Sequence, residues 1–180
     1  RYQMLVSLKS DITKEQIQEK VNDLQNYPEI TDLLKVNMQA GTLTTKESKD
    51  VQILIPEDNT RLEDFILLRK NGTKEYYHLS NNEIIITQKV AKLLNIKSGD
   101  IVKLKNADDQ EVEIKVQAIT ENYISHYVYM ASSLYQELFH SVPQENVILI
   151  KTDSLTTTQE ESLAKVILGD TEYVAGLNKN

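Results

Sequence analysis

The residues of this sequence that could do acid–base or metal chemistry are few and dispersed. The three histidines, His78, His126 and His140, lie far apart, and none stands in the H-x-x-x-H or H-x-E pattern that zinc ligands use. Cysteine is absent, which removes thiol nucleophiles, zinc–thiolate sites and disulfides together. No loop has the glycine pattern that wraps a phosphate. The sequence therefore predicts no catalytic, cofactor-binding or metal-ligating residues.

Pairs of acidic residues are the remaining candidates for acid–base catalysis. Two carboxylates would have to converge in one cleft to act as acid and base. The pairs instead lie in predicted turns or at predicted helix starts, where carboxylates serve structural roles. They are Glu57-Asp58, Glu63-Asp64, Asp108-Asp109 and Glu160-Glu161. A hydrolase built on His126 and a nearby carboxylate is therefore an alternative with almost no support in the sequence.

Tyrosine is unusually common, with 9 Tyr against 2 Phe. Three of the tyrosines, Tyr123, Tyr127 and Tyr129, fall within one short segment. An apolar ring with a polar tip suits a contact surface, so these three are the candidate residues for binding a partner. The competing interpretation is that alternate tyrosines border the core of a small barrel, and the residues alone favour that second interpretation.

The net charge of the chain is negative, which disfavours some classes of binding partner. Lys plus Arg number 20 against 27 Asp plus Glu, which gives a formal charge of −7. Nucleic acids and anionic lipid headgroups cannot be approached by such a surface without local counter-charge, so a nucleic-acid partner is disfavoured. A hydrophobic content of 40% is ordinary for a globular protein. No apolar run approaches the roughly 20 residues that span a bilayer.

The two ends of the chain carry the same β-α-β pattern. Residues 2–9 alternate as a strand, and Thr13 with Gln16 forms a capping box for a helix that must end before Pro28. Strands at 33–44 and 51–55 follow. Near the other end, Val147 to Ile150 is an apolar strand, Thr156 with Gln159 caps a helix, Gly169 is expected in the left-handed conformation, and a strand covers 172–176.

The middle of the chain is mostly short strands. Asn71-Gly72 favours a type I′ hairpin between residues 65–69 and 75–79. Further strands are expected at 84–86, 101–105, 111–119 and 127–130, with short helices after Thr87 and over 132–139.

These patterns predict an α+β fold. The two chain ends complete one split β-α-β lobe, formed by residues 1–55 and 143–178. Residues 60–142 form an inserted, mostly β, barrel-like lobe.

Several segments, taken in order, resemble a known family. Residues 83–100 contain a strand, a helix and a Gly99-Asp100 turn that look like those of extracytoplasmic domains in FtsX-like, MacB-type ABC transporter permeases. The segments that follow resemble the large permeases of Gram-positive bacteria; they are 112–119, 121–130 and 135–139, with 2–8, 55–58 and 65–69 upstream. Ala118 departs from the family, in which many members carry glycine.

The resemblance implies a place and partners for the chain. It implies one excised extracellular domain, residues 1–180, lying between two transmembrane helices of a permease at the outer face of the cell membrane. ATP is then bound by a separate cytoplasmic ATPase subunit, and this domain holds no cofactor. The expected partners are the permease's own helices, that ATPase, and an unknown extracellular protein, peptide or lipid client.

Two functions follow as hypotheses. In the first, the domain is non-catalytic and couples ATP hydrolysis, through the transmembrane helices, to a lipoprotein, a peptide or a cell-wall hydrolase. In the second, it is an extracellular sensing module that binds a peptide, an antibiotic or a lipid in a concave pocket.

Overall fold

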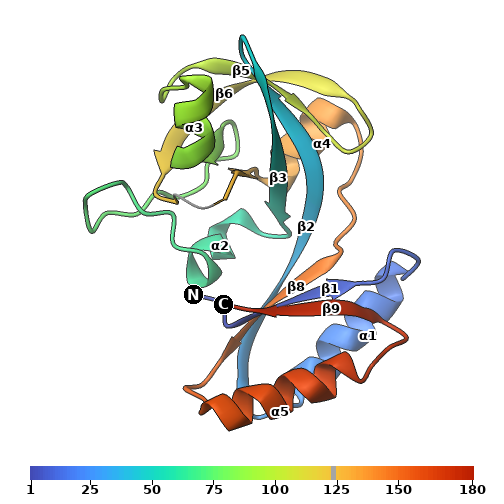
Figure 1. Ribbon diagram of the computed structural model, residues 1–180. Coiled ribbons are helices and arrows are strands. Elements are labelled where there is room, and N and C mark those ends of the chain that lie inside the picture. The colour runs from blue at the N-terminus through green and yellow to red at the C-terminus, as the bar shows by residue number, and fades with distance from the viewer. Residues whose placement is uncertain (123–124) are drawn as a thin grey trace. The chain divides into compact units, whose positions relative to one another are not determined.

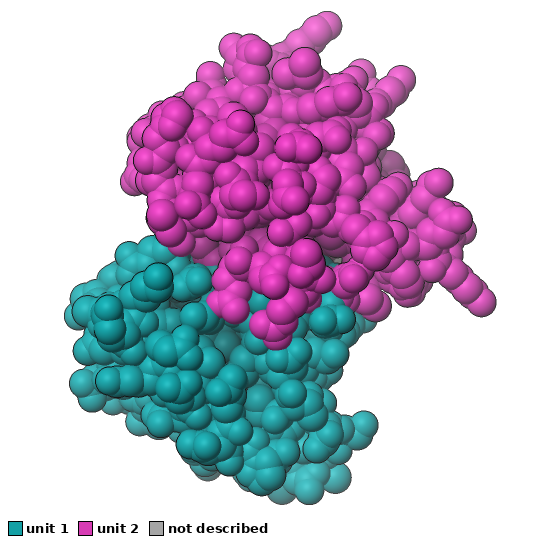
Figure 2. All heavy atoms as spheres, turned by 180° about the vertical axis from the view of Figure 1, so that it is seen from behind, with its two compact units in different colours: residues 1–36, 64–66, 144–180 teal, residues 37–63, 67–143 magenta. Residues whose placement is uncertain are grey.

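The computed structural model describes residues 1–122 and 125–180, and it divides into two compact units (Figures 1 and 2). Unit 1 comprises Arg1–Val36, Asp64–Ile66 and Gln144–Asn180, and unit 2 comprises Asn37–Glu63 and Leu67–Pro143. The first boundary expected from sequence was residue 55, but the structure places it at residue 36. The reason is that one strand of 15 residues, β2 (Ile30–Thr44), belongs to unit 1 in its first half and to unit 2 in its second.

Unit 1 is the predicted split β-α-β lobe. Its strands lie in the order β2-β8-β1-β9 and all pairings are antiparallel. The elements are β1 (Met4–Leu8), α1 (Lys14–Gln25), β8 (Val147–Thr152), α5 (Thr157–Leu168) and β9 (Val174–Lys179). Both helices pack on the same face of the sheet, because Ile17 of α1 and Ile167 of α5 share one core with Val6 of β1 (Figure 1).

Both long helices start as the sequence predicts. Thr13 accepts a hydrogen bond from the amide of Gln16, whose side chain accepts from the amide of Thr13. Thr156 and Gln159 form the same capping box at the start of α5. The expectation for the end of α5 was wrong, since Gly169 has a φ of −64° and continues in the right-handed region.

Unit 2 contains six strands and short helices. Its strands, besides the second half of β2, are β3 (Ser48–Pro56), β4 (Ile84–Thr87), β5 (Ile101–Lys105), β6 (Glu111–Thr120) and β7 (Tyr127–Tyr129). Its helices are η1 (Asn59–Arg61), α2 (Leu62–Phe65), α3 (Gln88–Leu94) and α4 (Ser132–Phe139), with the end of α2 belonging to unit 1.

The six strands pair in a ring, β2-β5-β6-β4-β7-β3, because β3 also pairs with β2. Two of these pairings, β3 with β7 and β4 with β6, are parallel, and β7 is only 3 residues long. The ring is therefore a mixed sheet and not a regular barrel. Its interior is filled by aliphatic side chains, with Ile53, Ile86 and Leu104 fully buried.

The predicted hairpin at Asn71-Gly72 is reduced to a loop. Gly72 has a φ of 72°, but Asn71 is not in the left-handed region, so the turn is not type I′. One isolated bridge joins Arg69 to Tyr76. Leu68 and Leu79 are buried and anchor the base of the loop, but neither belongs to a paired strand. The local turn signal was therefore misleading.

Candidate functional site

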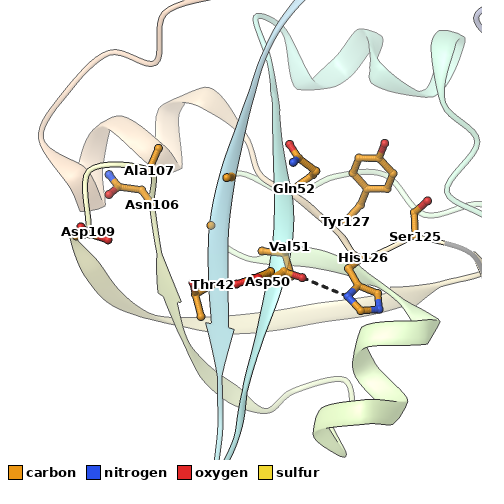
Figure 3. Close-up of a pocket in the computed structure, with 12 residues that line it drawn as sticks. Thr42, Asp50, Val51, Gln52, Asn106, Ala107, Asp109, Ser125, His126 and Tyr127 are labelled. Atoms are coloured by element: carbon orange, nitrogen blue, oxygen red, sulfur yellow. Dashed lines mark hydrogen bonds between the residues drawn. The ribbon is translucent and has the colours of Figure 1, made fainter. Parts of the chain in front are cut away.

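The surface of unit 2 carries an open hollow of about 610 Å³, shown in Figure 3. One side is formed by the neighbouring strands β2 and β3, which contribute Thr42 and Asp50. The other sides are the β5–β6 turn, with Asp109, and the start of β7, with His126 and Tyr127. Its lining is therefore about equally polar and apolar, and it includes two carboxylates.

His126 lines this hollow, and its two ring nitrogens differ in their hydrogen bonding. Its Nδ1 lies 3.2 Å from the backbone oxygen of Asp50, the contact drawn as a dashed line in Figure 3. A carbonyl oxygen only accepts, so Nδ1 carries a proton in this contact, and Nε2 is an acceptor in the tautomer that has its one proton on Nδ1. Nε2 is buried, and no donor among the described residues reaches it. The ring is therefore anchored to β3 through one nitrogen only.

A buried polar network holds the β5–β6 turn at the rim of the hollow. The hydroxyl of Tyr135 accepts hydrogen bonds from Asn106 Nδ2 at 3.1 Å and from Gln39 Nε2 at 3.3 Å. Gln39 Oε1 in turn accepts from the amide of Ala107 at 2.9 Å, and Asn106 Oδ1 accepts from the amide of Gln110. The turn that contributes Asp109 is thus fixed from α4 and β2, by residues that are 29 to 68 positions away from it in the chain.

Gly41 allows the strands beneath the hollow to approach closely. A Cβ at this position would lie 2.6 Å from both Ile53 Cδ1 and the backbone oxygen of Lys105. The strands β3 and β5 therefore flank β2 at a distance that only glycine permits. No pattern in the sequence indicates the role of Gly41 or the Gln39–Asn106–Tyr135 network. Periodicity carries no signal for contacts of this separation.

The three candidate tyrosines do not form one exposed surface. Tyr123 lies outside the described residues. The Tyr127 and Tyr129 rings stack with centroids 5.8 Å apart, and Tyr129 is only 4% exposed. Tyr129 is therefore corrected from a surface position to a core position, because β7 is paired on both sides, with β3 and β4. Tyr127 is half-buried and lines the hollow.

The remaining histidines and acidic pairs are dispersed. His78 is exposed and lies 2.5 Å from Glu63 Oε2, while His140 caps the end of α4 with a φ of 58°. Asp58 caps the short helix η1 by accepting from Thr60. Within residues 1–122 and 125–180, no group of three or more His, Asp or Glu side chains is placed to hold a metal ion.

The two chain ends lie side by side in unit 1. Strands β1 and β9 are antiparallel neighbours, with Met4 opposite Lys179. The amide of Asn180 donates to the oxygen of Gln3 at 2.9 Å, and its side chain donates to the oxygen of Tyr2 at 2.9 Å. The first and last residues of the sequence therefore lie side by side, as N and C mark in Figure 1.

Solved structures with this fold are extracytoplasmic parts of transporters. The periplasmic region of MacB from Actinobacillus actinomycetemcomitans aligns with a TM-score of 0.57 and 14% identity, over 99% of this chain and 88% of that one. The extracellular domain of the noncanonic ABC-type transporter YknZ from Gram-positive bacteria aligns with a TM-score of 0.55 and 16% identity, over all of both chains. This chain has the MacB-like extracytoplasmic fold.

The MacB-like fold confirms the resemblance drawn from the sequence at the level of architecture. A scan against protein-family models finds no match for the sequence, and neither does a search of curated proteins. Within the described residues, no helix is long and apolar enough to cross a membrane.

Proposed function

We propose that this chain is the non-catalytic extracellular domain of an ABC transporter permease. In this proposal it stands at the outer face of the cell membrane between two transmembrane helices. A separate cytoplasmic subunit binds and hydrolyses ATP, and the domain transmits the resulting helix movement to an extracellular protein, peptide or lipid client.

The observation that carries the proposal is the pairing of β1 with β9 in a MacB-like fold. A domain inserted between two neighbouring helices must receive and return the chain at one place, and Met4 and Lys179 lie opposite each other. The strand β2 also supports mechanical coupling, because one continuous strand of 15 residues serves both units. The backbone that joins the two units at residue 36 is therefore part of a strand and not of a loop.

The hollow of unit 2 favours a second candidate function, the sensing of a small ligand. A volume of about 610 Å³ falls within the range of small-molecule sites. His126 Nε2 is an acceptor that a ligand N–H or O–H group could satisfy. The two functions differ in their first event, since ligand binding initiates sensing whereas ATP hydrolysis initiates mechanical coupling.

The location can be tested by surface labelling in cells. Residues 1–180 contain no cysteine, so a single Val142→Cys substitution at a highly exposed position gives the only cysteine within this domain, and cysteines elsewhere in the full-length protein are first replaced by serine. In the full-length protein on intact cells, a membrane-impermeant maleimide is expected to label this cysteine. Val128→Cys, whose side chain is fully buried, is the matched control. Labelling of Val142→Cys only after the cells are broken would contradict the proposal.

The coupling can be tested with a pair of spin labels in the reconstituted permease and its ATPase. Cysteines at Leu168 in unit 1 and Ile101 in unit 2 occupy exposed positions. The distance distribution between them is expected to change on ATP addition and to remain fixed with a hydrolysis-deficient ATPase. A distribution that responds to a bound ligand and not to ATP would overturn mechanical coupling in favour of sensing.

A further inference from the structure

One segment of the chain combines basic and aromatic residues and directly follows residues 64–66 of unit 1. It is the loop at 67–77, in which residues 69–76 are exposed without interruption. Leu67 is 44% exposed and Tyr76 is 40% exposed. Lipid-facing rims of proteins combine aromatic rings with Lys and Arg in this way. We propose that this loop rests on the anionic headgroups of the membrane that, in the proposed function, receives the two chain ends.

The position of the loop follows from contacts within unit 1 and from chain connectivity. The oxygen of Phe65 accepts a hydrogen bond from the amide of Tyr2 at 2.8 Å, so the end of α2 is fastened to the residues that precede β1. Leu67 follows two residues later, within roughly 7 Å even if the backbone is fully extended. The first residue of the loop is therefore within a short length of backbone of the contact at Tyr2.

The base of the loop is fixed while its tip is open to contact. Phe65, Leu68 and Leu79 are buried, and the oxygen of Leu68 accepts from the amide of Tyr77 at 2.8 Å. The Arg69 guanidinium lies 5.7 Å from the centre of the Tyr76 ring, and its NH2 group donates to the Tyr76 hydroxyl at 3.4 Å. The cation and the ring are thus held together as one exposed unit.

The charge of the loop is opposite to that of the chain. Residues 69–75 contain Arg69, Lys70 and Lys74 against Glu75, which gives 3 − 1 = +2 in a chain of −7. Glu75 pairs with Lys70 at 3.8 Å, and the net charge of +2 then comes from Arg69 and Lys74. Glu121 is the further carboxylate that acts on Arg69.

Unit 1 itself carries two cations at the chain ends. Lys151 lies 5.8 Å from the centre of the Phe65 ring, and Lys179 stands opposite Met4 at the chain ends. Acidic groups more than about 10 Å away are screened at physiological ionic strength, so the local cations and not the net charge govern contact with headgroups. Each cation near an anionic surface is attracted to it, which provides the counter-charge that an acidic protein requires.

The test uses the absence of cysteine and tryptophan from the chain. One cysteine added after Asn180 couples the whole chain to a maleimide lipid in a vesicle, which brings both ends to the membrane. A Tyr76→Trp substitution then supplies the only tryptophan, whose emission is read with a quencher attached to the lipid chains. Leu67→Trp reports from the same loop with the Arg69–Tyr76 contact intact. Ile101→Trp, at a position 68% exposed, is the matched control.

The expected result is at least about twofold stronger quenching of Tyr76→Trp and Leu67→Trp than of Ile101→Trp on vesicles that contain phosphatidylglycerol. The excess of quenching at Tyr76→Trp and Leu67→Trp over that at Ile101→Trp should be smaller on vesicles of phosphatidylcholine alone and in high salt. It should also be smaller when Lys70→Gln and Lys74→Gln are combined with the tryptophan substitution. Equal quenching at all three positions, or quenching that is independent of phosphatidylglycerol, would overturn the inference.

This experiment separates the inference from the proposed function on which it rests. The tether places the chain ends at a membrane whatever the natural protein does. If the loop fails to contact lipid in this experiment, only the proposed lipid contact is disproved. If the surface labelling in cells fails, the proposed extracellular location is disproved.

Discussion

Lys20 Nζ lies 2.7 Å from Asp170 Oδ2, which ties α1 to the second residue after the end of α5. The Lys20 side chain is only 8% exposed and the Asp170 side chain is 26% exposed. The two partners are therefore unequal, because the carboxylate can be solvated without the lysine whereas the ammonium is buried without the carboxylate.

This asymmetry predicts different costs for removing each partner. Asp170→Asn should lower the free energy of unfolding by about 2 to 3 kcal/mol, since it leaves a buried ammonium unpaired. Lys20→Met should cost clearly less, because it replaces the buried ammonium by an apolar chain of similar length. Urea unfolding followed by circular dichroism measures both. Equal costs for the two variants would contradict the asymmetry.

Gly41 provides a prediction about backbone approach in unit 2. Gly41→Ala should destabilise the protein by about 1 to 3 kcal/mol, because the added methyl group meets a backbone oxygen that cannot move aside. Gly176→Ala is the matched control, also in a strand, where no described atom lies within 4 Å of the new Cβ. Thermal unfolding of the two variants should therefore differ, and a Gly41→Ala variant as stable as Gly176→Ala would show that β2 can shift.

The Tyr135 hydroxyl provides a prediction about the rim of the hollow. Tyr135→Phe leaves one N–H of Asn106 and one of Gln39 without their acceptor and should cost about 1 to 2 kcal/mol. The amides of Ala107 and Gln110 should then exchange with deuterium faster. Tyr76→Phe, which removes a hydroxyl from an exposed ring, should change neither quantity. Unchanged exchange in Tyr135→Phe would mean that Gln39 and Asn106 hold the turn without it.

Asp58 provides a prediction about pH. The hydroxyl and the amide of Thr60 both donate to its carboxylate, and these hydrogen bonds hold the pKa of Asp58 below its ordinary value. A carboxyl whose pKa is lowered by folding adds stability above its unfolded pKa of about 4 and loses it as the pH falls through the folded value.

The variant Asp58→Ala should therefore be less stable than the parent chain at pH 7, and the two should converge below about pH 4. Urea unfolding at a series of pH values measures the difference. Asp153→Ala, which removes an exposed carboxylate for which no such capping bonds are described, is the control. A difference between Asp58→Ala and the parent that stays constant down to low pH would show that the cap acts through packing and not through charge.

The sequence by itself determined the local elements whose signals lie within a few residues. The capping boxes of Thr13 and Thr156 fixed both helix starts, and the β-α-β pattern at each end predicted the split lobe, because these features depend on contacts three or four positions apart. Ordered segments over the whole chain also indicated the MacB-like fold.

Only the tertiary structure decided which residues meet across the chain. It divided β2 between two units, placed Tyr129 in the core, and joined Gln39, Asn106 and Tyr135 into one network. It also fastened Phe65, two residues before the basic loop, to Tyr2. Burial and hydrogen bonding between distant segments depend on how strands pair, and periodicity along one strand says nothing about its partner.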